Sequence, residues 1–120
     1  MLIRSILALA LSASSAIANV NVCTLHPTEK HLLPSFAVYE HEGVIHSATL
    51  EYMTEYGDSL PYLFVCGTNC VMDMAGDNYR YIISVEPNLR SPELVTLVTE
   101  SKNDEFRTVE TLRVSACKLR

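Results

Sequence analysis

Four cysteines constrain this chain more than any other feature of its sequence. They are Cys23, Cys66, Cys70 and Cys117, and all of them follow an N-terminal stretch that has the features of an export signal. An even number of cysteines in a small exported domain predicts two disulfides, because the compartment is oxidising. Four cysteines allow three pairings. We favour Cys66 with Cys70, which are close in sequence, and Cys23 with Cys117, which lie near the two chain ends.

The predicted export signal occupies residues 1–18. Arg4 is its only cation, an apolar stretch follows over residues 6–11, and residues 16–18 read Ala-Ile-Ala, the small-x-small pattern that signal peptidases cut after. The apolar stretch is much shorter than the roughly 20 residues that a membrane-spanning helix needs. We therefore predict a signal peptide over 1–18, a single domain over 19–120, a periplasmic or secreted location and no membrane insertion after signal cleavage.

The charge balance narrows the classes of partner. The chain has 14 acidic and 9 basic side chains, and loss of Arg4 with the signal peptide makes the remaining domain still more acidic. Nucleic-acid binding depends on Lys and Arg at phosphates, and binding to an anionic membrane surface depends on clusters of the same residues. The composition argues against both, and we expect another protein as the partner.

Apolar residues recur with a period of two along most of the domain, which predicts strands. Ser91-Pro92-Glu93 could cap a helix, but the β-branched residues that follow favour a strand over Ser91–Glu100. We predict a mainly β domain of about six to seven strands with little helix: a small antiparallel sandwich, barrel or bent sheet that is stapled by disulfides. The remaining predicted strands are Asn19–Leu25, the two arms of a hairpin within Ser35–Thr54, Tyr62–Cys66 with apolar cover on both sides, Tyr79–Val85, and Phe106–Leu119 with Leu112, Val114 and Ala116 on one face.

The hairpin is the clearest pattern in the chain. Its alternation breaks at His41-Glu42-Gly43, where Gly43 can adopt a positive φ, and a three-residue loop with glycine in the left-handed position is expected. That loop would place Phe36 opposite Ala48 and Val38 opposite His46. We prefer this register to a two-residue Glu42-Gly43 turn, because it gathers most of the apolar residues on one face.

The motifs of enzymes, metal sites and redox centres are weak in this sequence. Cys66 and Cys70 are separated by three residues in a β context, whereas redox pairs have two residues at a helix start. His41 and His46 should point to opposite faces of an extended hairpin, so they make a poor pair of metal ligands. Asp73–Asn78 lacks the ligand alternation of a calcium loop. No nucleophile stands beside a base, so we predict a protein that is not an enzyme and has no cofactor or metal site.

Recognition is the remaining role. Six tyrosines are the dominant aromatic residues of the chain, and tyrosine is enriched at protein interfaces. The hairpin tip Glu40, His41 and Glu42 could insert into a basic or polar cleft of a target, and we name these three residues as the partner-binding site. Alternatively, they form a solvated turn, and the tyrosines only line a sheet.

At the level of class, the chain resembles the small exported, disulfide-stapled β proteins of bacteria, among them periplasmic lysozyme inhibitors and immunity proteins. The Ser-Gly-x-x-Tyr type of inhibitor loop is absent, so the resemblance assigns no residues. It implies a non-enzymatic protein-binding module, most concretely an inhibitor or immunity protein. The alternatives are a structural or accessory component of the envelope or of a secretion system, and a metal or small-ligand binder.

Overall fold

The computed structural model describes residues 18–120, so the predicted signal peptide lies outside the described residues except for Ala18, the first residue of β1. No helix of the length and apolarity needed to cross a membrane is present within this range. Each strand forms where the sequence has either the period-two pattern or a short apolar run. The strands are β1 (Ala18–Leu25), β2 (Leu32–His41), β3 (Val44–Met53), β4 (Ser59–Cys66), β5 (Cys70–Met72), β6 (Tyr79–Pro87), β7 (Pro92–Ser101) and β8 (Arg107–Leu119).

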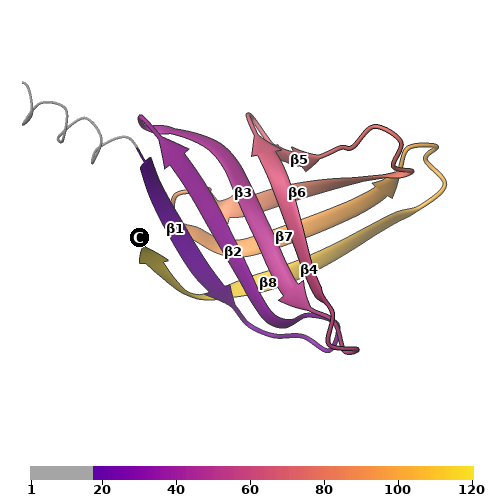
Figure 1. Ribbon diagram of the computed structural model, residues 1–120, viewed down its shortest axis with the longest axis horizontal. Helices are drawn as coiled ribbons and strands as arrows, with labels where there is room; N and C mark the ends of the chain where they lie inside the picture. The colour runs from indigo at the N-terminus through magenta and orange to yellow at the C-terminus, as the bar shows by residue number, and fades with distance from the viewer. Residues whose placement is uncertain (1–17) are drawn as a thin grey trace, which may run out of the picture.

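The strands form a closed antiparallel barrel in which each strand pairs with the next and β8 returns to β1 (Figure 1). The predicted mainly β, antiparallel class is therefore confirmed, and the barrel is the correct choice among the predicted architectures. The predicted number of strands was too low, since there are eight. The missing strand is β5, which has only three residues and lies between two turns, so it has no periodicity to detect.

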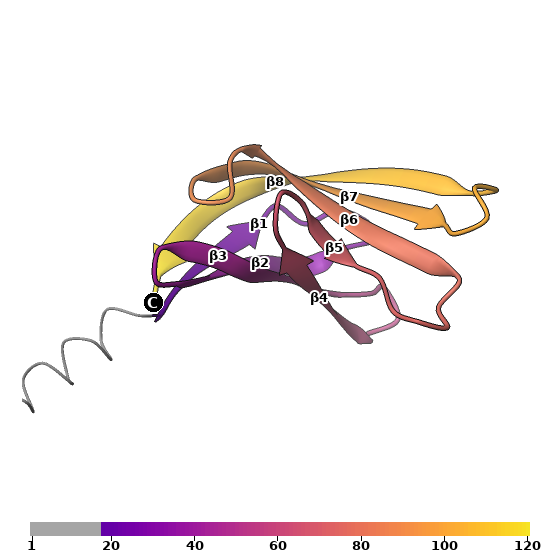
Figure 2. The same cartoon turned by 90° about the horizontal axis from the view of Figure 1, so that it is seen from above.

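The barrel has two halves whose strands run in different directions. The strands β1–β4 cross the direction of β6–β8, and Figures 1 and 2 show the two groups as separate curved layers. The halves meet along β1 and β8 on one side and through the short β5 on the other. We call these two junctions the long seam and the short seam.

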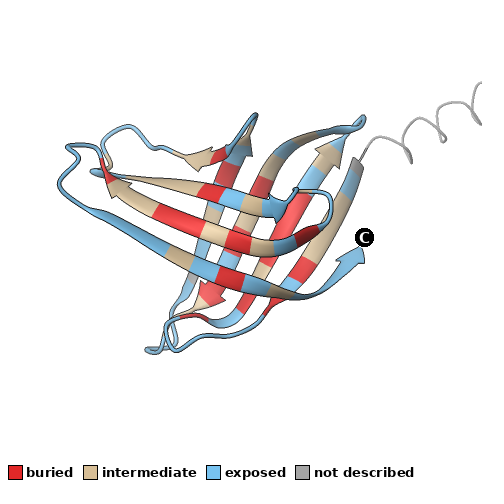
Figure 3. Cartoon of the chain, turned by 180° about the vertical axis from the view of Figure 1, so that it is seen from behind, coloured by how far each residue is buried: buried red, intermediate tan, exposed pale blue. Residues whose placement is uncertain are grey.

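The interior of the barrel is filled by large apolar side chains from every long strand. They alternate with outward-facing residues, as the red and paler bands along the strands show (Figure 3). Burial of this surface is the main force that holds such a fold together. The largest fully buried side chains are Phe36, Phe64, Leu50, Leu112 and Val95, together with Cys23 and Cys70.

The β2–β3 hairpin differs from the predicted register. His41 pairs with Val44 around a two-residue turn in which Glu42 and Gly43 both have positive φ (52° and 80°), as the favoured hairpin turns require. A β-bulge then shifts the register, so that Phe36 lies opposite Leu50, two positions from the prediction. The predicted register was wrong. The shift of two keeps Ala48, Leu50 and Tyr52 on the inner face, but the bulge places Ile45 against the core and leaves Val44 and His46 exposed.

Two further expectations about the strands need correction. The strand β4 is not covered on both sides, because Leu63 and Val65 point outward and are 60% and 72% exposed. In β8, Ala116 does not share the inner face of Leu112, since a register shift opposite Thr24 and Leu25 moves Ala116 to the outside. The segment Ser91–Glu100 is a strand, as favoured, and forms most of β7.

The two disulfides join Cys23 to Cys117 and Cys66 to Cys70, the pairing that we favoured from the sequence. Each joins residues that lie directly opposite one another in neighbouring strands, Cys23 and Cys117 in the long seam and Cys66 and Cys70 in the short seam. Together they indicate an oxidising environment outside the cytoplasm.

Candidate functional site

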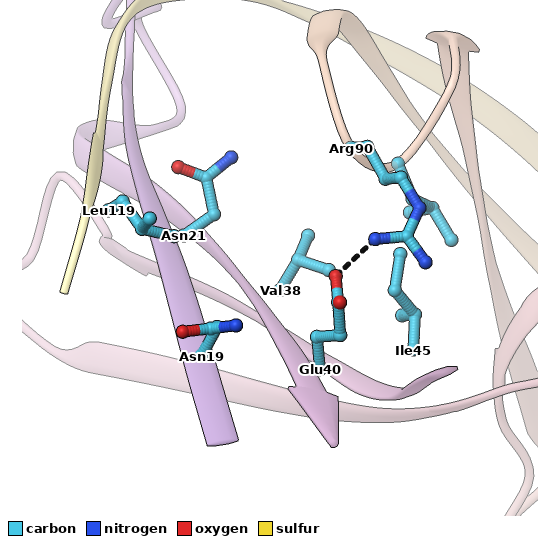
Figure 4. Close-up of a pocket in the computed structure, with 8 residues that line it drawn as sticks. Asn19, Asn21, Val38, Glu40, Ile45, Arg90 and Leu119 are labelled. Atoms are coloured by element: carbon cyan, nitrogen blue, oxygen red, sulfur yellow. Dashed lines mark hydrogen bonds and ion pairs between the residues drawn. The ribbon is translucent and has the colours of Figure 1, made fainter. Parts of the chain in front are cut away.

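The predicted partner-binding residues lie at one mouth of the barrel. Glu40 points inward and its carboxylate pairs with the guanidinium of Arg90, which comes from the loop between β6 and β7 (Figure 4). Arg90 also donates a hydrogen bond to the carbonyl oxygen of Gly43 at 2.6 Å. One arginine therefore connects the β2–β3 hairpin to the opposite half of the barrel.

The loop that carries Arg90 is held by a side chain at its start. The Oδ1 atom of Asn88 accepts hydrogen bonds from the backbone N–H groups of Arg90 and Ser91, at 3.0 and 2.9 Å. Such a turn, in which an Asn side chain binds the backbone two residues on, fixes the direction in which the next side chain leaves the loop. Arg90 therefore lies over the mouth even though its side chain is 55% exposed.

The cavity beneath Arg90 has a volume of about 300 Å³, at the lower limit of ligand pockets. Asn19 and Asn21 project toward it from β1 (Figure 4), and Val38 and Ile45 form part of its apolar wall. The combination of an ion pair, two amides and an apolar wall can hold a small polar molecule.

The hairpin tip is less acidic than its sequence indicates. The charge of Glu40 is compensated by Arg90, so Glu42 is the acid that the tip presents, with its side chain 71% exposed. His41 is half-exposed beside it, with Nε2 at 4.0 Å from a carboxylate oxygen of Glu42. Of the three predicted residues, two are available on the outer surface and one belongs to the mouth.

The two hairpin histidines lie closer together than the sequence predicted. Their ring centroids are 6.1 Å apart, because the β-bulge leaves His46 without an opposing residue and turns it toward the exposed side on which His41 lies. The expectation that they point to opposite faces was wrong. Within residues 18–120, no group of three or more potential ligands is arranged to hold a metal ion.

The opposite mouth of the barrel contains a polar cluster that sequence reasoning missed. His31 is 4% exposed and its Nε2 atom lies 3.2 Å from a carboxylate oxygen of Glu110 in β8. Because the carboxylate can only accept, Nε2 carries a proton and donates to Glu110, while Nδ1 shares a hydrogen bond of 2.8 Å with the Thr28 hydroxyl. The spacing Thr28-x-x-His31 was a local signal for half of this cluster, whereas Glu110 is too far along the chain to have been connected with it.

The trio of hydroxyl, imidazole and carboxylate has the order of a proton relay. However, the Thr28 oxygen also accepts the backbone N–H of His31 at 3.1 Å, and the N–H of Thr28 binds the carbonyl oxygen of His31. The hydroxyl is thus part of a tight turn that closes the barrel end. The arrangement satisfies a buried histidine, as buried polar groups require.

Tyrosines continue this cluster across the barrel interior. The ring of Tyr52 meets His31 edge-on at 4.4 Å, and its hydroxyl lies 3.3 Å from that of Tyr62. The Tyr62 ring in turn lies 5.2 Å from that of Tyr81. Burial raises the pKa of Tyr52 well above its usual range, assisted by the hydrogen bond with Tyr62, and burial also raises the pKa of Tyr81. Burial therefore favours the neutral forms of Tyr52 and Tyr81.

The outer wall carries an apolar strip that crosses four neighbouring strand pairs. Its five residues lie directly opposite one another in successive ladders from β4 to β8, and each is flanked in its own strand by inward-facing residues. The two ends of the strip are the most exposed, Val65 at 72% and Val109 at 54%. We call this the outer strip, and its members are Val65, Val71, Ile82, Val98 and Val109.

Polar rows border the outer strip on the half of the barrel formed by β6–β8. On one side lies the ion pair of Arg80 and Glu100, which raises the pKa of the Arg80 guanidinium through its hydrogen bond. On the other side Thr96 and Thr111 lie opposite each other. An apolar centre with a polar rim is the usual anatomy of a protein interface.

Comparison of the chain with known protein families, with curated proteins and with solved structures finds no match.

Proposed function

We propose that this protein is an exported, non-enzymatic module that binds another protein, and that the outer strip is its contact surface. The observation that carries this proposal is the continuity of the strip: five apolar side chains lie side by side across the wall. Its two ends, Val65 and Val109, are exposed, Val71 and Ile82 are half-buried, and Val98 is 8% exposed. A contiguous exposed apolar patch rimmed by polar residues marks an interaction site more often than scattered apolar residues do.

The more specific form of the proposal is a periplasmic inhibitor or immunity protein. The disulfides support a location outside the cytoplasm, and the rigid, doubly stapled barrel suits a protein that binds without large rearrangement. In this form, the exposed tip residues His41 and Glu42 add a polar contact at the rim, while Glu40 serves the barrel mouth.

Site-specific photo-crosslinking in the cells that make the protein tests the proposal. A photoreactive residue replaces Val65 in the outer strip or, as the matched control, Thr111, which is exposed on the same wall in the polar row. We expect one recurring protein adduct from position 65 that is absent from position 111 and that disappears when Val109→Arg is added. No adduct from position 65, or the same adducts from both positions, would contradict the proposal.

The barrel mouth supports a second candidate, a binder of a small polar ligand. It rests on the cavity of about 300 Å³ beneath Arg90 and on the two amides beside it. The melting temperatures of the wild type and of Arg90→Ala, each measured with sets of small metabolites, test this candidate. A metabolite that binds at the mouth should stabilise the wild type but not Arg90→Ala.

A further inference from the structure

The strand β4 has a backbone edge that the barrel does not use. It pairs with β3 from Ser59 to Val65, but with β5 only at Val65 and Cys66. Over residues 59–64, β4 therefore has no strand partner on its second side within the part of the chain that the structure describes. Figure 1 shows the reason, since β5 lies beside one end of β4 only.

Side chains, and not backbone hydrogen bonds, close the wall at this place. Tyr62 of β4 and Tyr81 of β6 approach within 5.2 Å between ring centroids on the inner side. On the outer side Leu63 is 60% exposed, directly beside Val65 of the outer strip. A strand that binds at this edge would therefore meet unpaired backbone groups, with tyrosine rings on the inner side of the wall and apolar side chains on the outer side.

Natural proteins protect such edges, and β4 carries one protective device. Pro61 lies within the unpaired stretch, and proline, which lacks an N–H, is found in sheets on edge strands. It does not affect the backbone groups of Tyr62, Leu63 and Phe64. This three-residue segment lies next to the β4–β5 ladder, which begins at Val65. It is the part of the edge that remains available for pairing with another strand.

The charges around the edge indicate what kind of strand fits it. Glu55 and Asp58 lie in the turn before β4, and Glu51 lies in β3 opposite Pro61. None of the three forms an ion pair with another residue in the range 18–120. Antiparallel pairing with the β4 edge of a second copy would place the uncharged residues 65–69 of that copy beside these acids, and the second copy would add the same net charge of −5. A partner segment with basic residues at this end is complementary instead.

We infer that the edge of β4 accepts an extended strand of the partner, paired antiparallel, with apolar side chains beside Leu63 and basic side chains at its C-terminal end next to Asp58. This inference rests on the proposed protein-binding function and specifies how the partner is held. Strand addition gives affinity through main-chain hydrogen bonds and specificity through alternate side chains. It would extend the contact surface from the outer strip across the short seam.

A designed peptide serves as the probe, because the test needs only the chemistry of the strand. It alternates valine and threonine over about six residues, a common strand length, and ends in a lysine pair. We expect it to bind the mature domain and to slow hydrogen exchange of those amides in Tyr62–Phe64 that do not face β3, while amides around Thr111 are unchanged. A peptide with N-methyl groups on alternate residues should bind about tenfold more weakly or worse, because it has lost backbone donors.

A protein variant tests the charge preference separately. Glu55→Gln combined with Asp58→Asn should weaken the lysine peptide and leave a matched peptide that ends in serines unaffected. Absence of binding, equal binding of the N-methylated peptide, protection only at other strands, or a dimer of the protein that protects the same amides without peptide would each overturn the inference. If the adduct at position 65 is found and the peptide does not bind, the edge inference alone has failed; if position 65 gives no adduct, the proposed function itself has failed.

Discussion

The two seams of the barrel are closed by different means. The long seam between β1 and β8 has five registered residue pairs, and Val20 and Arg120 add two backbone hydrogen bonds at its end. The short seam between β4 and β5 has two registered pairs. Each contains a disulfide between residues that face each other, but only the long seam has a continuous ladder beside it. In the short seam a disulfide and a few aromatic contacts take the place of a backbone ladder, and one edge of β4 is left open.

The loops that the two disulfides close also differ. Cys23 and Cys117 are 94 residues apart, whereas Cys66 and Cys70 are 4 apart. In the chain-entropy model, the restriction that a disulfide imposes on the unfolded chain grows with the length of the loop. The disulfide of the long seam should therefore contribute more to stability than that of the short seam.

Breaking the disulfide of the long seam should have the largest effect. We expect Cys23→Ala with Cys117→Ala to lower the free energy of unfolding by about 4 to 5 kcal/mol, since the closed loop spans almost the whole domain. Urea denaturation of the mature protein measures the change. A loss no greater than that for the short-seam variant described next would show that the ladder between β1 and β8 suffices without its clip.

Breaking the disulfide of the short seam should have a smaller and more local effect. We expect Cys66→Ser with Cys70→Ser to lower the free energy of unfolding by about 2 kcal/mol and to speed hydrogen exchange in β5 before that of β2 and β3. The same denaturation experiment and exchange resolved by residue measure both effects. Uniform acceleration across all strands would show that the short seam does not open independently. Partner binding should persist in this variant unless the turn Gly67–Asn69 is itself a contact surface.

The sequence revealed the strands and the inner face because both depend on local alternation. The inner positions of β2, and those of β3 from Ala48 onward, followed from period two and remained correct although the register was wrong by two residues, since such a shift does not exchange the faces. The bulge at His46 could not be predicted, because nothing local distinguishes it. The strand β5 was missed because three residues cannot show a period.

The candidate sites were much less accessible to sequence reasoning. The contacts Glu40–Arg90 and His31–Glu110 join residues that only the closed barrel brings together. The outer strip depends on the register of four successive strand pairs, so a single error in a predicted register would prevent its prediction. Its members are ordinary alternating residues when each strand is considered alone. Tyrosines were singled out for an interface, but Tyr52 and Tyr62 join each other inside the barrel.

The tyrosine cluster that β3, β4 and β6 place inside the barrel should weaken at alkaline pH. The folded-state pKa values of Tyr52 and Tyr81 are raised, so folding favours their neutral forms. Their contribution is fully present below the unfolded-state pKa of about 10 and is lost as pH rises from there through the folded-state values. Phenolate absorbance should show these two tyrosines ionising last, and the Tyr52→Phe, Tyr81→Phe variant should lose less stability above that pH. An identical alkaline loss in the variant would contradict this assignment.

The ion pair of Arg90 with Glu40 is a further connection between the two halves, and it should contribute least. The Arg90 side chain is 55% exposed, and exposed ion pairs contribute about 0 to 1 kcal/mol because water and salt screen them. We expect Arg90→Ala to lower the free energy of unfolding by less than about 1 kcal/mol, with a difference that shrinks further in high salt. Arg90→Lys is the matched control, since it keeps the charge but cannot reach Glu40 and the Gly43 carbonyl with the same planar fork. A loss as large as that of the short-seam disulfide would place Arg90 among the structural connections of the barrel, and the mouth would then be a closed end and not a site for a ligand.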